Sequence, residues 1–438
     1  MEFKKSTVEE LIEQDVIEKP MDGNHGSIHP KTKDFTDVGI PFITAADIHS
    51  DKVDLEKANK LSEKDAQKLK KGFAKKRDVL LTHKASVGRT AIVNNMEYDY
   101  IILSPQVTYY RIKDTTTMLP EYLYLYFKSN YFNQIINQWA GGSTRKYIGI
   151  TAQKKLPILY PSIKNQKKIV DFIMTFEYKV QVNKKIIANL EELSQTLFKR
   201  WFVDFEFPDE NGNPYKSSGG VMVDSELGNI PELWSVIKTN DLFKIHSGYA
   251  FKSKWWDDSG YNVIKIKDIN NKSIDVNGLD KVKENYVKKA SKFKVYGGEI
   301  IIALTGATAG KMGIVPKLKQ TAFVNQRVGL ITSNIDNVYI YHLLNSERIK
   351  RLTLEQAIGS AQANISPVKF GNIKIISADK KIIDRYCQLT KNNYEKIVEL
   401  HSENNYLTQL RDTLLPKLMS GEIEIPDDIE VNEDELSI

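Results

Sequence analysis

Two segments have residue types that could bind a nucleotide or a metal ion, and both depart from the pattern that this chemistry needs. TGATAGKM (305–312) resembles a phosphate-binding loop, but its glycines are one residue too close together. Met312 also stands where Ser or Thr would bind magnesium, so we predict a turn between two strands. His25 and His29 flank a glycine-rich turn, but no third metal ligand is evident beside them.

Motifs for DNA modification or cleavage are missing as well. The sequence has no Pro-Pro pair, which the Asp/Asn/Ser-Pro-Pro-Tyr/Phe motif of an adenine methyltransferase requires. The Asp and Glu residues show no nuclease-like Pro-Asp … Asp/Glu-x-Lys arrangement. We therefore expect no catalytic site, no metal site and no cofactor bound by this chain itself.

Basic residues form two clusters, KLKKGFAKKR (68–77) and KVKENYVKKASKFK (281–294). Lysines of this kind neutralise DNA phosphates and make binding dependent on salt, without specifying bases. The alternative is a solvated surface with no ligand. The candidate phosphate contacts are Lys70, Lys71, Lys75, Lys76, Lys288, Lys289 and Lys292.

Reading of base edges needs Arg, Lys, Asn or Gln in a geometry that allows paired hydrogen bonds, with aromatic groups for packing. Such residues lie beside glycine-rich or small-residue turns in both halves of the chain, although Trp255 could equally be packed inside. The candidates are Asn24, His25, Lys84, Arg89, Arg145 and Lys146 in the first half, and Lys252, Lys254, Trp255, Lys311, Gln326, Arg327 and Gln362 in the second.

The charge of the chain supports a polyanionic partner. The 438 residues carry a net charge of +6, but residues 421–438 hold eight acids and no Lys or Arg, which leaves 6 + 8 = +14 on residues 1–420. A basic body most often indicates nucleic acid, although a lysine-rich composition alone could produce it. A single cysteine, Cys387, excludes an intramolecular disulfide. Neither a transmembrane span nor a secretory signal is apparent, so we expect a cytoplasmic protein.

The sequence repeats itself. GIPFITAADI (39–48) matches GYNVIKIKDI (260–269) at an offset of 221, and DVLLTHKASVGRTAIV (78–93) resembles EIIIALTGATAGKMGIV (299–315). EYLYLYFKS (121–129) matches VYIYHLLNS (338–346) at an offset of 217, and GSTRKYI (142–148) matches GSAQANI (359–365) at the same offset. One module of about 200 residues is therefore present twice, far longer than a solenoid repeat.

Each module ends in a polar segment whose apolar residues recur at alternating spacings of three and four. This narrow seam predicts a coiled coil of two long helices. If the helices are antiparallel about a pseudo-twofold axis, contacting residue numbers sum to a constant. Pairing Asn183 with Asn404, and Ile187 with Leu400, gives 587 in both cases and lets the two asparagines bond to each other. The predicted seam comprises Val180, Asn183, Ile187, Leu190, Ile397, Leu400, Asn404 and Leu407.

The expected fold is α+β, with two mixed α/β domains joined by two long antiparallel helices. Residues 208–220 (PDENGNPYKSSGG) are turn-like and predict a linker. The expected segments are a first mixed α/β domain (1–160), a first long helix (161–205), a connecting loop (206–235), a second mixed α/β domain (236–378), a second long helix (379–420) and an acidic tail (421–438).

Several of these segments resemble the specificity subunits of type I restriction-modification systems. The likeness includes the run LFKRWFVDFEFPDENGNPYKSSGGVMVDSELGNIPELW (197–234), and it extends to DGNHGSIHPK (22–31), GSAQANIS (359–366) and TLLPKLMSGEI (413–423). It covers nearly the whole chain in the expected order and spacing.

The resemblance implies two target-recognition domains, each reading one half of a split, asymmetric DNA target. It also implies long helices that separate these domains and dock two methyltransferase subunits, with restriction subunits in the full complex. S-adenosylmethionine, ATP and magnesium would then belong to the partner subunits. Two alternatives remain open: a solitary or antagonistic paralogue that binds methyltransferase subunits without supporting restriction, and a standalone DNA-modifying enzyme.

Overall fold

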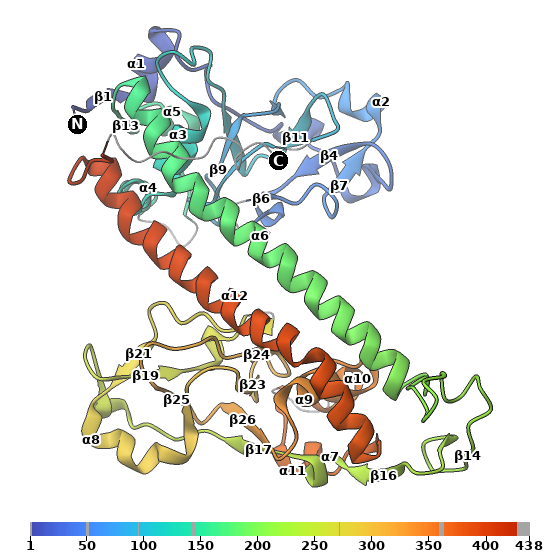
Figure 1. Cartoon of the computed structure of the whole chain (residues 1–438). Helices are drawn as coiled ribbons and strands as arrows, with labels where there is room; N and C mark the ends of the chain where they lie inside the picture. Colours follow the sequence, from blue (N-terminus) through green and yellow to red (C-terminus); the bar gives the residue numbers. More distant parts are fainter. Residues whose placement is uncertain are drawn as a thin grey trace. The chain divides into compact units, whose positions relative to one another are not determined.

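In a computed structural model, the chain forms two compact units (Figure 1). Unit 1 comprises Met1–Tyr178 and Leu410–Ile438, and unit 2 comprises Lys179–Gln409. The structure describes residues 2–49, 52–94, 96–141, 146–270, 272–358 and 363–426. Most of the acidic tail therefore lies outside the described residues.

Unit 1 begins with short strands and ends in helices. Its elements are β1 (Lys4–Thr7), α1 (Val8–Glu13), β2 (Met21–Asp22), β3 (Phe35–Thr36), β4 (Ile40–Ile43), β5 (Ile48–His49), β6 (Lys52–Val53), β7 (Asn59–Leu61), α2 (Glu63–Ala66), β8 (Phe73–Ala74), β9 (Val79–Thr82), β10 (Thr90–Ile92), β11 (Ile101–Leu103), β12 (Val107–Tyr110), α3 (Pro120–Lys128), α4 (Asn130–Trp139), α5 (Ile150–Gln153) and β13 (Pro157–Tyr160). The long helix α6 (Ile163–Phe202) follows and continues into unit 2.

Unit 2 has a similar succession of elements, preceded by the two short strands β14 (Met222–Val223) and β15 (Ile230–Pro231). The elements that follow these strands are β16 (Ser235–Lys238), α7 (Thr239–Leu242), β17 (Phe243–Ser247), β18 (Trp256–Asp257), β19 (Tyr261–Ile264), β20 (Lys272–Ser273), β21 (Asp280–Val282), α8 (Glu284–Val287), β22 (Lys294–Val295), β23 (Ile300–Ala303), β24 (Met312–Ile314), β25 (Ala322–Val324), β26 (Val328–Ser333), α9 (Asn337–Leu344), α10 (Glu347–Ile358), α11 (Pro367–Gly371) and β27 (Lys374–Ser377). The second long helix, α12 (Lys380–Ser420), ends in unit 1.

The sheets confirm the duplication. The order β10-β9-β12-β2 in unit 1 corresponds to β24-β23-β26-β17 in unit 2, and β3-β7-β4-β11-β8 corresponds to β18-β21-β19-β25-β22. In the second sheet of each unit the equivalent pair, β4 with β11 or β19 with β25, is parallel, and β20 adds a fifth strand to the first sheet of unit 2. The strands β3 and β18 (35 and 256) begin 221 residues apart, as do β9 and β23 (79 and 300), and the offset is 217 from α3 and α9 onward (120 and 337). The expected two mixed α/β domains with long helices are thus observed.

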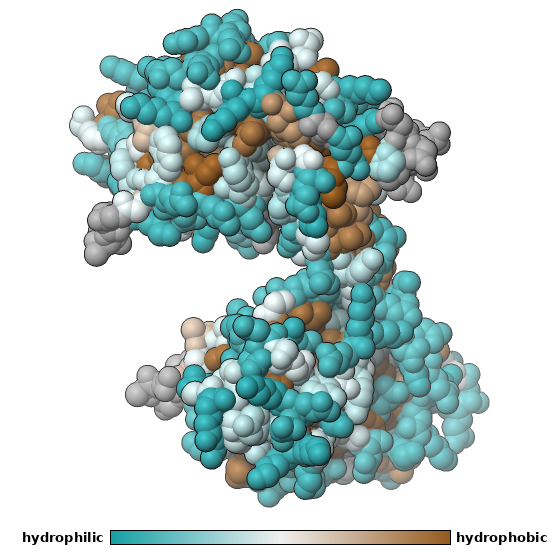
Figure 2. Space-filling view, turned by 90° about the vertical axis from the view of Figure 1, so that its left-hand side faces the viewer, coloured by the Kyte–Doolittle hydropathy of each residue, from teal (hydrophilic) through white to brown (hydrophobic). Residues whose placement is uncertain are grey.

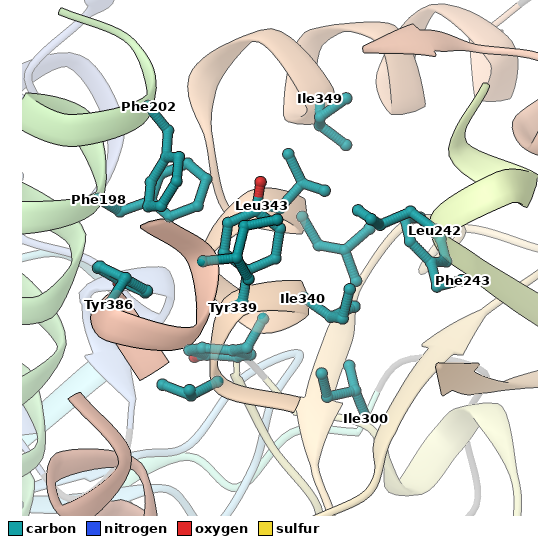
Figure 3. Close-up of a cluster of buried hydrophobic side chains, with 14 of the residues drawn as sticks. Phe198, Phe202, Leu242, Phe243, Ile300, Tyr339, Ile340, Leu343, Ile349 and Tyr386 are labelled. Carbon is teal, nitrogen blue, oxygen red and sulfur yellow. The ribbon is translucent and has the colours of Figure 1, made fainter. Parts of the chain in front are cut away.

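Continuous apolar runs form the central strands. All four residues of β9 (VLLT) and of β23 (IIIA) are buried, as expected for strands covered on both faces. In unit 2, α9 lies between this sheet and the long helices. Phe198 and Phe202 of α6, Tyr386 of α12 and Tyr339 of α9 meet in one aromatic cluster (Figure 3). The first sheet and the long helices of unit 2 consequently share one core.

The long helices of unit 2 are antiparallel and have the predicted register. The Asn183 side-chain amide donates to Asn404 Oδ1 at 3.0 Å, and Asn393 donates to Ser194 Oγ at 3.1 Å, so both pairs sum to 587. The seam positions are buried or half-buried. The two asparagines bond to each other as expected, but this bond does not satisfy both side chains. Asn183 is fully buried and its Oδ1 has no partner among the described residues, whereas Asn404 is only half-buried.

The same two helices are held together differently in unit 1. The Glu177 carboxylate on α6 accepts hydrogen bonds from Lys128 of α3, at 2.5 Å, and from Arg411 of α12, at 3.3 Å. Leu415, Leu418 and Met419 of α12 are buried in the core of unit 1. Each unit therefore packs against part of both long helices.

The connecting segment is more ordered than the predicted linker. Phe207 and Trp234, at its two ends, are both 6% exposed and stack with ring centroids 5.0 Å apart. Tyr215, from the turn-like stretch itself, stacks on the other side of Phe207 at 4.7 Å. The segment thereby buries aromatic surface, which its polar composition did not predict.

Hydrophilic residues cover most of the visible surface of both units, with smaller hydrophobic areas among them (Figure 2). In the described part of the chain, no helix is both long and apolar enough to cross a membrane.

Candidate nucleic-acid interface

Three loops of unit 1 that carry predicted site residues meet at one edge. The His83 backbone N–H donates to the Gln106 carbonyl at 3.0 Å, and the His83 carbonyl accepts from Ile148 N–H at 2.9 Å. Lys84 and Tyr147 form an antiparallel bridge beside them. Residues 83–89, 104–106 and 146–148 are therefore adjacent, and we call them the loop edge of unit 1.

Unit 2 builds the same edge from equivalent residues. Leu304 N–H donates to the Arg327 carbonyl at 2.9 Å, and the Leu304 carbonyl accepts from Ile365 N–H at 2.7 Å. Thr305 and Asn364 form the bridge that corresponds to Lys84 and Tyr147. The loop edge of unit 2 thus comprises residues 304–311, 325–327 and 363–365.

Three basic candidates lie at the loop edge of unit 1. Lys84, Arg89 and Lys146 are all exposed. The Arg89 guanidinium donates to the Ala45 carbonyl at 3.1 Å, and Lys146 Nζ donates to Asn137 Oδ1 at 2.8 Å. These bonds orient both cations while leaving them in contact with solvent. The fourth candidate, Arg145, lies outside the described residues.

The prediction that Asn24 contacts a base was wrong, because this side chain is buried and supports a loop. It is 2% exposed, its amide donates to the Lys71 carbonyl at 2.7 Å, and its Oδ1 accepts from Lys70 N–H at 3.0 Å. The expectation failed because the sequence does not show that residues 24 and 70–71 meet.

His25 stays exposed and is held by the buried carboxylate of Asp22, to which its Nε2 donates at 2.6 Å. Lys71 binds the other oxygen of the same carboxylate, so its charge is already paired. Burial opposes ionisation of Asp22, but the hydrogen bonds from Lys71 and His25 and their charges outweigh burial and lower the pKa of this carboxyl. Asp22 therefore brings together His25, a predicted base contact, and Lys71, a predicted phosphate contact.

The candidates of unit 2 occupy two neighbouring places. Lys311, Gln326 and Arg327 are exposed on the loop edge. Lys252, Lys254 and Trp255 belong to an adjacent segment, which is tied to the edge where Gln326 N–H donates to the Tyr249 carbonyl at 3.0 Å. Gln362 lies outside the described residues.

Trp255 is partly packed. Its ring stacks on that of Tyr286 with centroids 4.7 Å apart, and Lys252 Nζ lies 5.5 Å from the Trp255 ring centroid. The stack fixes the lysine beside the loop edge by a cation–π contact. Trp255 is therefore better placed to orient Lys252 than to reach a base.

The basic clusters are mostly exposed. Among the described residues no partner is found for the side chains of Lys70, Lys75, Lys76, Lys288, Lys289 and Lys292. In contrast, Arg77 forms a two-bond ion pair with Glu121, and Lys283 pairs with Asp257. The unpaired lysines are the ones free to neutralise a polyanion.

The segment that resembles a phosphate-binding loop is a turn. Residues 305–311 form the turn between the antiparallel strands β23 and β24, as predicted. No group of three potential metal ligands occurs among the described residues.

Tyr147, Asn364 and Gln106 lie on the loop edges but were missed by sequence reasoning. Tyr147 and Asn364 correspond at the offset of 217 that the repeat already gave, and Gln106 corresponds to Arg327 at 221. Comparing the candidates of one half with those of the other would have found Gln106, but not Tyr147 or Asn364, because neither of these was a candidate.

A family model for the type I restriction modification DNA specificity domain matches the chain twice, at residues 9–192 and 231–400. The chain belongs to this family. The two matches correspond to the two copies of the module. As a member of this family, the chain is a specificity subunit that recognises a DNA target.

Relatives of this specificity family extend over the whole chain. The type I restriction enzyme MjaIX specificity subunit of Methanocaldococcus jannaschii is 26% identical and covers 97% of both chains. The HindI specificity subunit of Haemophilus influenzae is 26% identical over 80% of this chain and 87% of its own. The S subunit of a type I restriction-modification system from M. genitalium shares the fold with a TM-score of 0.54, at 14% identity, covering 98% of this chain and 97% of the other.

Proposed function

We propose that this specificity subunit reads a split, asymmetric DNA target, with one half-site contacted by the loop edge of each unit. The observation that carries the proposal is the duplicated edge, in which one backbone arrangement displays different side chains. Lys84 and Tyr147 in unit 1 correspond to Thr305 and Asn364 in unit 2. Because direct readout depends on the side chains that face the base edges, two such edges would prefer different sequences.

The exposed lysine clusters would supply the affinity that does not depend on sequence. Their charges would neutralise phosphates flanking each half-site, and release of condensed counterions would make binding fall with salt. The anchored cations, such as Arg89, would be fixed before DNA arrives, which lowers the entropy lost on binding.

The long helices would set the distance between the half-sites and dock two methyltransferase subunits, with restriction subunits in the full complex. In this arrangement the chain itself has no catalytic role. S-adenosylmethionine, ATP and magnesium would be bound by the partner subunits.

The test is to co-express the chain with its methyltransferase subunit and to map N6-methyladenine across the host genome. The expected result is methylation confined to one split, asymmetric sequence and lost when the chain is omitted. Methylation without this chain, or a continuous rather than split target, would refute the proposal. Normal methylation without cleavage, once restriction subunits are added, would instead identify a paralogue that does not support restriction.

Shortening the long helices tests their role separately. Deleting one heptad from each helix, around Asn183 and Asn404, preserves the pairing of the seam and should change the half-site spacing without changing the bases read. An unchanged spacing in the mapped target would exclude the helices as the spacer.

A further inference from the structure

Tyr147 and Asn364 occupy equivalent positions on the two loop edges, and their surroundings distinguish them from the other candidates. Each forms the bridge to the turn opposite it, with Lys84 or Thr305 as its partner. Tyr147 is 51% exposed, and Asn364 is exposed as well. Both residues combine a restrained backbone with an outward side chain.

The restraint comes from hydrogen bonds on both sides of each residue. In unit 1, Ala85 N–H donates to the carbonyl of Lys146 at 3.2 Å, and Ile148 N–H donates to the carbonyl of His83 at 2.9 Å. The same two bonds in unit 2 are 2.9 Å (Gly306 to Ala363) and 2.7 Å (Ile365 to Leu304). A side chain on a backbone fixed in this way is held close to one geometry, which sequence-specific contact requires.

A buried residue follows each position and anchors it. Ile148 and Ile365 are both 1% exposed and belong to the cores of their units. The alternation of an outward and an inward side chain places Tyr147 and Asn364 on the solvent side of the bridge. Substitution at 147 or 364 is thus expected to leave the core intact.

The chemistry of the two side chains differs. Among the described residues, the Asn364 carboxamide has no hydrogen-bond partner, so its donor and acceptor are both available. A carboxamide matches the N6 donor and N7 acceptor of adenine in the major groove. Tyr147 offers a ring instead, with its centroid 5.7 Å from that of His83.

The layer beneath the edge differs too. His83 is fully buried, its Nδ1 lies 3.0 Å from the Ile148 carbonyl oxygen, and its Nε2 has no partner among the described residues. Burial lowers the pKa of His83, which keeps the ring neutral beneath Tyr147. Unit 2 has the apolar Leu304 in this place. The edge of unit 1 therefore presents an aromatic surface and that of unit 2 a free amide.

We propose that these two residues are specificity determinants: Asn364 reads an adenine in one half-site, and Tyr147 packs against the methyl group of a thymine in the other. This inference rests on the proposed function and extends it to one base in each half of the target. It requires that substitutions at 147 and 364 act on opposite halves.

The experiment uses the complex of this chain with its methyltransferase subunit and reads the target from the map of N6-methyladenine. Asn364→Asp replaces the amide donor by a carboxylate, which accepts from cytosine N4 but repels adenine N7. We expect the accepted base at one position to change from adenine to cytosine, by about tenfold or more in preference, with the other half unchanged. Asn364→Ala should relax the same position towards all four bases.

Tyr147→Asn provides the reciprocal variant. It should replace a thymine preference by an adenine preference at one position of the opposite half. Asn211→Asp in the connecting segment is the matched control, because it makes the same chemical change at an exposed position of unit 2 that belongs to neither a loop edge nor a lysine cluster. It should leave every base preference as it is.

The outcomes separate the inference from the proposed function. A wild-type complex without a split target would refute the proposed function. A wild-type split target that stays unchanged in Asn364→Asp, Asn364→Ala and Tyr147→Asn would overturn only the inference. A change in the same half from both positions would overturn it as well.

Discussion

Glu191, on the long helix α6, bonds to two residues of the second recognition domain. Its carboxylate, on a side chain that is 10% exposed, accepts a hydrogen bond from the buried Tyr341 hydroxyl at 2.5 Å and pairs with Lys272 Nζ at 2.5 Å. Lys272 has a φ of 66°, a conformation that costs a non-glycine residue about 1–3 kcal/mol. Because the edge strand β20 begins at this residue, the pair connects the recognition sheet to the helix.

Glu191→Gln keeps the shape of the side chain and an oxygen for Tyr341 but removes the charge. Hydrogen bonds to charged groups contribute about 1.5–3 kcal/mol, and neutral ones about 0.5–1.5 kcal/mol. The Lys272 side chain is 40% exposed and can be hydrated, so its share of the loss is the smaller one. We expect unit 2 to lose about 2 kcal/mol of unfolding free energy. Glu191→Ala leaves the buried Tyr341 hydroxyl without an acceptor, which adds about 1–3 kcal/mol to the lost bonds, so it should cost more than Glu191→Gln.

Tryptophan fluorescence during urea unfolding can follow this loss. Trp139 is the only tryptophan of unit 1, and the other four, Trp201, Trp234, Trp255 and Trp256, belong to unit 2. In a Trp139→Phe background the signal therefore comes from unit 2. With a slope of about 2–3 kcal/mol per molar urea, Glu191→Gln should lower the midpoint by roughly 0.7–1 M.

Glu399→Gln is the matched control. It makes the same substitution in an ion pair with Lys317 whose side chains are 47% and 64% exposed, so no measurable shift is expected. A midpoint for Glu191→Gln no lower than that of Glu399→Gln would refute the reasoning.

Three further predictions concern pH, salt and packing. Burial lowers the pKa of His342 to about 4, so the unfolded chain gains a proton between about pH 6.5 and 4 that the folded chain resists. Stability should fall by up to about 3 kcal/mol as pH drops through that range, and urea unfolding of His342→Gln should show a shallower fall; an equal fall would contradict this. Replacing Lys75 and Lys76 by Ala should lower the slope of log affinity against log salt by about 0.9 for each lost phosphate contact and keep the target sequence, whereas an altered sequence would contradict a phosphate role. An alanine Cβ at Gly23 would lie 1.8 Å from the Leu103 carbonyl oxygen, so thermal unfolding should show a loss of about 3 kcal/mol or more. Gly26→Ala has nothing within 4 Å of its Cβ and meets only the strain of its φ of +70°, about 1–2 kcal/mol, so equal losses at the two positions would contradict the clash.

Features with a long or repeated pattern could be predicted from the sequence. The constant offset between GIPFITAADI and GYNVIKIKDI corresponds to equivalent strands in equivalent sheets, because duplicated apolar patterns bury the same faces. The pairing of Asn183 with Asn404 also followed from the sequence. Polar residues at seam positions leave few registers in which they face each other.

Contacts between distant loops could not be predicted in this way. Asn24 looked like an exposed polar residue in a turn, yet it is buried against Lys70 and Lys71, which lie 46 and 47 residues later. Tyr147 and Asn364 were passed over because only the bridges to Lys84 and Thr305 place them at the edge. Local composition does not predict which distant loops meet, because these contacts depend on how the sheets pack against each other.

The sequence by itself determined the duplication, the seam of the long helices and the family, because each depends on periodicity or on motif order along the chain. Only the tertiary structure decided which side chains share a loop edge and which are already committed to the fold. That decision depends on burial and hydrogen bonding between segments far apart in sequence, such as residues 83, 106 and 148 in unit 1. Asn24 and Asn364 illustrate the difference. Both are asparagines beside turns, but the amide of Asn24 is hydrogen-bonded to the backbone, whereas that of Asn364 is exposed.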